Sequence, residues 1–126
     1  MRFFTRVVIS FVVLSGVFGG CDRSPPPQKG DLEPRLKAAL QIVNLSDRDA
    51  TLKAVASDAA DLGVGEVVKR AVGSMTNLSE RDSAASNSAL RLAKAGQAGA
   101  ATEVAGMMTN MSDRDSTLRK LGEGAR

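Results

Sequence analysis

The sequence predicts an all-α fold, a short right-handed α-solenoid of helix-turn-helix repeats that follows an apolar N-terminal segment and a Pro-rich tether. Three observations lead to this prediction. A six-residue motif occurs three times at a spacing of 33 residues. Apolar residues recur with helical spacing after the copies, and the only long apolar run lies within the first twenty residues. A fixed period of this length is typical of stacked units that bury their apolar faces on one another.

The N-terminal segment 1–20 has the layout of an export signal. Arg2 and Arg6 give it a basic start, the stretch 7–18 (VVISFVVLSGVF) is almost wholly apolar, and Gly19-Gly20-Cys21 follows. A helix that spans a bilayer needs roughly 20 apolar residues. We therefore expect this segment to be removed as a signal peptide.

Removal of the segment changes the composition of the chain. All four Phe residues lie within it, and the chain has no Trp or Tyr. Without Arg2 and Arg6, fifteen of the seventeen basic residues remain against fourteen acidic ones. Nucleic-acid binding relies on many phosphate contacts and on aromatic stacking, so no nucleic-acid partner is predicted.

Cys21 is the only cysteine, so it cannot form a disulfide within the chain. The stretch Phe18-Gly19-Gly20-Cys21 resembles the lipobox of bacterial lipoproteins, although Phe18 stands where that family usually has Leu. The resemblance implies that Cys21 receives diacylglycerol and becomes the mature N-terminus. Two alternatives stay open: an ordinary cleaved signal that leaves a free thiol, and an uncleaved signal-anchor.

The lipobox resemblance also implies a location, on a bacterial membrane and facing the periplasm. Asp22 resembles the signal that retains lipoproteins at the inner membrane of enteric bacteria, so the inner membrane is favoured and the outer membrane stays open. We expect residues 21–33 to form the lipidated cysteine and a Pro-rich linker. Three consecutive prolines, 25–27, favour polyproline II, and ten residues of it reach roughly 30 Å. A polyproline ligand for a partner is the alternative use of this stretch.

The repeated motif is NLSDRD at 44–49, NLSERD at 77–82 and NMSDRD at 110–115. Each copy is typical of a helix start, because a Ser hydroxyl can cap the first turn and an acidic residue three positions later can reach back to it. The predicted N-terminal caps are Ser46 with Asp49, Ser79 with Asp82, and Ser112 with Asp115.

Residues 34–126 are thus predicted to form a helical-repeat domain with two alternating kinds of helix. B helices are expected at 34–44, 66–77 and 99–110, and A helices at 47–62, 80–95 and 113–121. Pro34 suits a first helical position, and Gly63 and Gly96 suit helix C-termini. The residues expected to face the core are Leu52, Val55, Ala56, Ala59, Ala85, Ser88, Ala89 and Leu92 of the A helices, and Ala38, Ala39, Ile42, Leu45, Val68, Ala71, Val72, Met75, Ala101, Val104, Ala105 and Met108 of the B helices.

A helix pair of this length, with small residues at fixed places, resembles the tetratricopeptide repeat over about residues 34–121. Leu52, Val55, Ala56 and Ala59 fall where that family places the apolar residues of its first helix, and Gly63 falls at its inter-helix turn. The chain lacks the family's usual aromatics and the Pro near the end of each unit. The resemblance implies a peptide-binding surface lined by the A helices.

The charged residues of the A helices give candidate partner contacts. Arg48, Arg81 and Arg114 would form a ladder, either for the carboxylates of a partner or, as we favour, for pairing across the turns between repeats. Side chains beside the apolar stripes are further candidates: Lys53, Asp58, Ser86, Asn87 and Arg91.

Enzymatic chemistry finds little support in the composition. The chain has no histidine and one cysteine, which excludes Cys/His nucleophiles, histidine acid–base catalysis and Cys/His zinc sites. Paired carboxylates stay conceivable, yet the acidic residues are expected at caps and exposed faces, where nothing raises a pKa. We therefore predict no catalytic residue, no metal, no cofactor and no small-molecule substrate.

These inferences predict a membrane-anchored lipoprotein that serves as a protein–protein interaction scaffold or assembly accessory at the bacterial cell envelope, with another envelope protein as its partner. Two alternatives remain. One is a small periplasmic inhibitor or immunity-type lipoprotein, and the other is a structural lipoprotein without a dedicated partner.

Overall fold

The computed structural model describes residues 25–124, and the regular elements among them are all helices, so the all-α fold class is confirmed. The helices are α1 (Lys29–Leu40), α2 (Leu45–Asp61), α3 (Gly65–Gly73), α4 (Leu78–Lys94), α5 (Ala98–Gly106) and α6 (Met111–Gly124).

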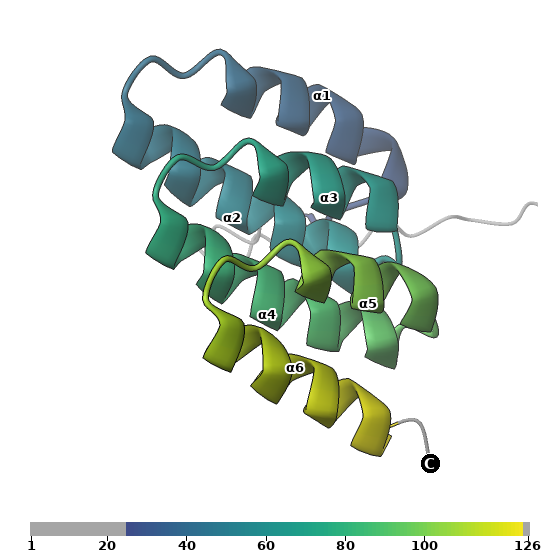
Figure 1. The fold of residues 1–126 in the computed structure, drawn as a ribbon. Coiled ribbons are helices and arrows are strands. Elements are labelled where there is room, and N and C mark those ends of the chain that lie inside the picture. The colour runs from purple at the N-terminus through teal and green to yellow at the C-terminus, as the bar shows by residue number, and fades with distance from the viewer. Residues whose placement is uncertain (1–24, 125–126) are drawn as a thin grey trace, which may run out of the picture.

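The helices lie in two layers (Figure 1). The B helices α1, α3 and α5 form one row and the A helices α2, α4 and α6 form the other. Within the B row, α1 contacts α3 and α3 contacts α5; within the A row, α2 contacts α4 and α4 contacts α6. Each helix also contacts the helices that directly precede and follow it in the chain. The 33-residue period explains this regularity, because α2, α4 and α6 begin one period apart. The right-handed sense of the stack stays a prediction.

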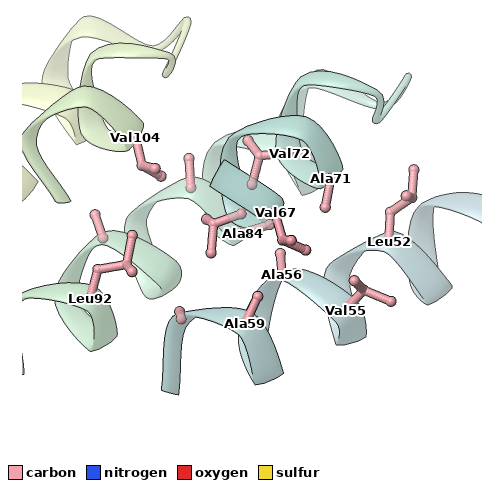
Figure 2. Close-up of a cluster of buried hydrophobic side chains, with 14 of the residues drawn as sticks. Leu52, Val55, Ala56, Ala59, Val67, Ala71, Val72, Ala84, Leu92 and Val104 are labelled. Carbon is pink, nitrogen blue, oxygen red and sulfur yellow. The ribbon is translucent and has the colours of Figure 1, made fainter. Parts of the chain in front are cut away.

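The core runs between the two layers and consists mainly of Ala, Val and Leu side chains (Figure 2). The predicted stripes of α2 and α4 are buried throughout, with Ser88 as the one polar member. The predicted stripes of α3 and α5 are buried as well, and Met75 and Met108 just beyond these helices complete them. Helical spacing of apolar residues therefore identified the core of the second and third B helices and the first two A helices correctly.

The first B helix departs from its prediction. It begins at Lys29, not at Pro34, and Pro34 lies inside the helix. The side chains that α1 buries are Leu32, Leu36 and Ala39, whereas Ala38 and Leu45 are exposed and Ile42 is only half-buried. Burial of two leucines one turn apart stabilises the first turns by about 1.5–3 kcal/mol each, enough to offset an interior proline. The linker is therefore shorter than predicted.

Gly63 and Gly96 follow the ends of the first two A helices, α2 and α4, as predicted. Their φ angles are +71° and +81°, in the left-handed region that favours glycine. After α2, the N–H of Gly63 donates to the carbonyl of Ala60 and the N–H of Val64 donates to that of Ala59. The same pair of bonds follows α4. This is the Schellman arrangement, which satisfies carbonyl groups left open at a helix end.

Gly65 lets α3 and α5 approach closely, because a Cβ at this position would lie 2.6 Å from the Cβ of Ala100. We expect Gly65→Ala to lower the free energy of unfolding by about 1–3 kcal/mol, since the two helices would be forced apart. Gly99→Ala is the matched control, because a Cβ there meets no atom within 4 Å. The control should raise stability by up to about 1 kcal/mol, and urea titrations followed by circular dichroism would measure both. Equal effects of the two changes would contradict the close approach.

Candidate functional site

The N-terminal caps of the A helices are asparagines, which corrects the predicted serine caps. Asn44 Oδ1 accepts from the backbone N–H groups of Ser46 and Asp47 at 3.0 and 3.4 Å. Asn77 does the same one repeat later, at 3.1 and 3.2 Å, and Asn110 does so at 3.0 and 3.3 Å. Asparagine is among the strongest N-terminal caps. Because each A helix begins just after its asparagine, Ser46, Ser79 and Ser112 lie in the first turn and are exposed.

Asp49 and Asp82 do not reach back to their own helix starts; each binds the next repeat. The carboxylate of Asp49 accepts from the N–H of Thr76 at 3.1 Å, from the Thr76 hydroxyl at 2.9 Å and from the N–H of Asn77 at 2.8 Å. Asp82 accepts from the same three groups of Thr109 and Asn110, at 2.9, 2.8 and 2.7 Å. We call each such set, the Asp together with its Thr-Asn pair, a clamp. The clamps hold residues that were predicted to continue α3 and α5, which end instead at Gly73 and Gly106.

The two clamp aspartates are nearly buried and yet remain ionised. Burial alone would raise the pKa of each carboxyl. Hydrogen bonds from the Thr and Asn groups, followed by the charge of the adjacent Arg48 or Arg81, outweigh burial and hold the pKa of Asp49 and of Asp82 below the ordinary aspartate value. A buried carboxylate with several donors is expected to behave in this way.

The depressed pKa values make stability depend on pH. The unfolded chain takes up protons at these two positions near pH 4, before the folded chain does. The stability from the clamps is therefore complete above about pH 4 and is lost as the pH falls through the folded pKa values. We expect the urea midpoint to fall as the pH is lowered below about 4, and to fall less in a chain with both Asp49→Asn and Asp82→Asn. An equal fall in both chains would contradict this assignment.

Asp115, the equivalent aspartate of the third motif copy, is exposed, unlike Asp49 and Asp82. Its side chain is 72% exposed, and its ion pair among the described residues is a 4.0 Å contact with the neighbouring Arg114. The arginines also differ: Arg81 Nη2 donates to the carbonyl of Met107 at 3.1 Å, across the turn between repeats, while Arg48 is half-buried. The Arg81 contact agrees with the interpretation of the ladder that we favoured.

The side chains predicted to meet a partner on the A layer mostly bind neighbouring helices. Lys53 pairs with Glu80 at 2.8 Å, and Arg91 with Asp61 at 2.6 Å. Asp58 pairs with Arg35 of α1 at 2.7 Å, and the hydroxyls of Ser86 and Thr117 are 2.8 Å apart. Exposed pairs of this kind contribute about 0–1 kcal/mol each. Within residues 25–124, Lys53, Arg91 and Asp58 are thus engaged between helices.

The B layer carries a similar pairing. Lys69 on α3 contacts Glu103 on α5 at 2.7 Å and Glu66 on its own helix at 2.6 Å. The hydrogen bonds to Glu103 and then to Glu66 raise the pKa of Lys69. Both layers are therefore linked along the stack by ion pairs.

A row of exposed apolar side chains lies where the A helices begin. Leu45, Leu78 and Met111 are the first residues of α2, α4 and α6, and they are 53%, 56% and 66% exposed. We call these three residues the apolar row. They occupy the same position in three successive repeats, which was visible in the motif, but the prediction placed Leu45 in the core because the first B helix was extended too far.

The apolar row borders two equivalent grooves between successive A helices. The first, between α2 and α4, has Leu45, Asp49 and Thr76 in its lining, and the second, between α4 and α6, has Leu78, Asp82 and Thr109. Corresponding residues are one period apart. The surface therefore offers the same combination of an exposed apolar residue and a polar groove twice along the stack.

Cys21 and Asp22, the predicted lipidation and sorting residues, lie outside the described part of the chain. Within residues 25–124, none of the helices combines the length and the apolar character needed to cross a bilayer. The same residues contain no cluster of three or more His, Cys, Asp or Glu that could hold a metal ion.

Comparison of the chain with known protein families, with curated proteins and with solved structures gives no match. The tetratricopeptide and lipoprotein resemblances therefore stay predictions.

Proposed function

We propose that this chain is a lipid-anchored lipoprotein of the bacterial envelope that binds another protein through the apolar row, with no catalytic role. The observation that carries the proposal is the exposure of Leu45, Leu78 and Met111 at equivalent positions of three successive A helices. Single exposed apolar residues are common on protein surfaces, but apolar residues grouped on one surface mark interaction sites. The three side chains are not part of the core. Their recurrence at one position in each repeat suits an extended apolar segment of a partner.

The position of the tether supports a partner in the aqueous compartment rather than the bilayer surface. Pro25 to Pro27 lie beside Pro34, Arg35 and Asp58, near the C-terminal end of α2. Leu45 is at the opposite end of that helix, roughly 20 Å away at 1.5 Å per residue. A lipid on Cys21 would therefore hold the end of α2 near Asp58 toward the membrane and leave the apolar row on the far side.

The tether is also shorter than the sequence suggested. Because α1 begins at Lys29, the segment between Cys21 and the first helix covers residues 22–28. Pro25 to Pro27 lie beside residues of α1, and Cys21 is four positions before Pro25, a reach of roughly 13 Å. The proposed partner is therefore an envelope protein that comes close to the membrane surface.

The experiment that tests this function places a photo-crosslinking amino acid at position 78 in intact cells. We expect a discrete protein adduct from position 78 and none from position 37, an exposed site on α1 in the B layer. Leu78→Ser should abolish an adduct formed from position 45 without changing the thermal midpoint, because Leu78 is exposed. Equal adducts from positions 78 and 37 would contradict the proposal.

Lipid attachment needs its own measurement, which is independent of the partner. Cells given an alkyne analogue of palmitate should label the wild-type chain and leave Cys21→Ser unlabelled. Labelling that persists in the variant would contradict lipidation at Cys21, whatever the crosslinking result.

A further inference from the structure

The last A helix, α6, presents the clamp residues and an apolar stripe without a following repeat among the described residues. On α2 and α4, the stripes are covered by the B helices that follow them, α3 and α5. Leu118 and Leu121 of α6 align with Ala85 and Ser88 of α4. The α4 residues are buried, whereas Leu118 and Leu121 are only partly buried.

An apolar groove results at this end of the stack. We call it the end groove; its apolar lining comes from the C-terminal part of α4, from α5 and from α6, and includes Leu90, Ala93, Ala98, Leu118 and Leu121. The end groove is lined by the C-terminal part of α6, whereas Met111 of the apolar row is the first residue of that helix. Asp115 is on the same helix, three residues before Leu118 and four residues after Met111, so it lies between the end groove and the apolar row along α6.

The two internal junctions show what such an end accepts. In both, a nine-residue helix lies against the preceding A helix, and a Thr-Asn pair after it donates three hydrogen bonds to the clamp aspartate. At the α4 junction, Arg81 also donates to the carbonyl of Met107 just before that pair. Asp115 and Arg114 are the same two residues one period later, and their contact with each other is only a loose 4.0 Å pair.

From this equivalence, we propose that the end groove receives a short helix of another polypeptide, followed by a Thr-Asn turn that closes a third clamp on Asp115. The helix covers Leu118 and Leu121, the turn donates its two N–H groups and hydroxyl to the Asp115 carboxylate, and Arg114 binds the carbonyl at the end of the incoming helix. Continuity with the internal junctions defines the chemistry of this occupant.

A second copy of the same chain fits this end less well. The helix that it would offer is α1, in which Pro34 and Arg35 stand where α3 has Val67 and Val68, both of which are buried. Val43, 92% exposed, replaces the clamp threonine and supplies no hydroxyl. The N-terminal unit therefore lacks the groups that the end groove recognises, and a different polypeptide is the committed occupant.

The test uses the full chain in detergent micelles and a fluorescent synthetic peptide with the sequence of residues 65–94, which carries the Thr76-Asn77 pair. Anisotropy titration should show saturable binding. Asp115→Ala in the chain should weaken binding about ten-fold or more, because it removes charge-assisted hydrogen bonds. Asp113→Ala, which removes the same charge from the same helix, should change the affinity less than two-fold, on the order of measurement error.

A matched change in the peptide locates the contact. Thr76→Val in the peptide should weaken binding to the wild-type chain about ten-fold and should have little further effect on binding to the Asp115→Ala chain. Absence of binding, or binding that Asp115→Ala leaves unchanged, would overturn the proposal. Sedimentation of the full chain alone that shows a dimer lost in Asp115→Ala would assign the end groove to a second copy and also overturn it. None of these outcomes depends on position 78, so failure here leaves the proposed function standing.

Discussion

Asp82→Ala is expected to lower the free energy of unfolding by about 3 kcal/mol, because it removes three hydrogen bonds to a nearly buried carboxylate. The carboxylate of Asp82 is nearly buried and holds three donors of the next repeat at 2.7–2.9 Å. Without it, the two N–H groups and the hydroxyl at the start of α6 lose their acceptor. The chain lacks Trp and Tyr, so urea titrations followed by far-UV circular dichroism are the suitable measurement.

Asp115→Ala is the matched control for this prediction. The residue occupies the same motif position, beside the same kind of arginine, but its side chain is 72% exposed. Its replacement should change stability by no more than about 0.5 kcal/mol. Similar losses in the two variants would show that the aspartate acts within its own helix start, as the motif alone had suggested, and not between repeats.

Leu32→Ala is the second large expected effect, at about 2–5 kcal/mol. Leu32 lies in the stretch that the sequence assigned to the linker, where its truncation would cost almost nothing. In the structure, it is fully buried on α1 together with Leu36. The measured loss therefore distinguishes a helix that begins at Lys29 from one that begins at Pro34.

Leu45→Ala is the corresponding control. The sequence placed Leu45 in the core, but its side chain is 53% exposed at the start of α2. Its truncation should cost less than about 1 kcal/mol. If Leu45→Ala proved the more damaging of the two changes, the position of α1 and the exposure of the apolar row would both be wrong.

Periodicity made most of the fold predictable. The spacing of the motif and of Ala, Val and Leu identified the A helices, the second and third B helices and their buried faces, because burial of a helix stripe is a local and repeated requirement. The predicted start of the first B helix was wrong for a physical reason. The Pro-rich stretch and Pro34 indicated a start at residue 34, whereas the helix begins earlier because Leu32 and Leu36 pack in the core with residues of other helices.

The clamps could not be predicted from local rules. An Asp three residues after a Ser satisfies the pattern for a cap, and nothing near it in the sequence indicates that its partners lie 27 and 28 residues further on. One signal was available in the sequence. Thr76 and Thr109 each have an aspartate 27 residues earlier, whereas the equivalent position of the first unit has no such aspartate and holds a valine, Val43. The exposure of the apolar row likewise became clear only once the helix starts were placed.

The unit of α3 and α4 supplies both halves of the clamp. Its Thr76-Asn77 pair binds Asp49 of the preceding A helix, and its Asp82 binds the Thr109-Asn110 pair of the next unit. A deletion of residues 78–110 would bring Asn77 directly before Met111 and leave Asp49 bound to the same Thr-Asn pair. Loss of this whole unit would therefore preserve the clamp at the new boundary. The number of units can thus change by duplication or excision without a substitution in the clamp residues.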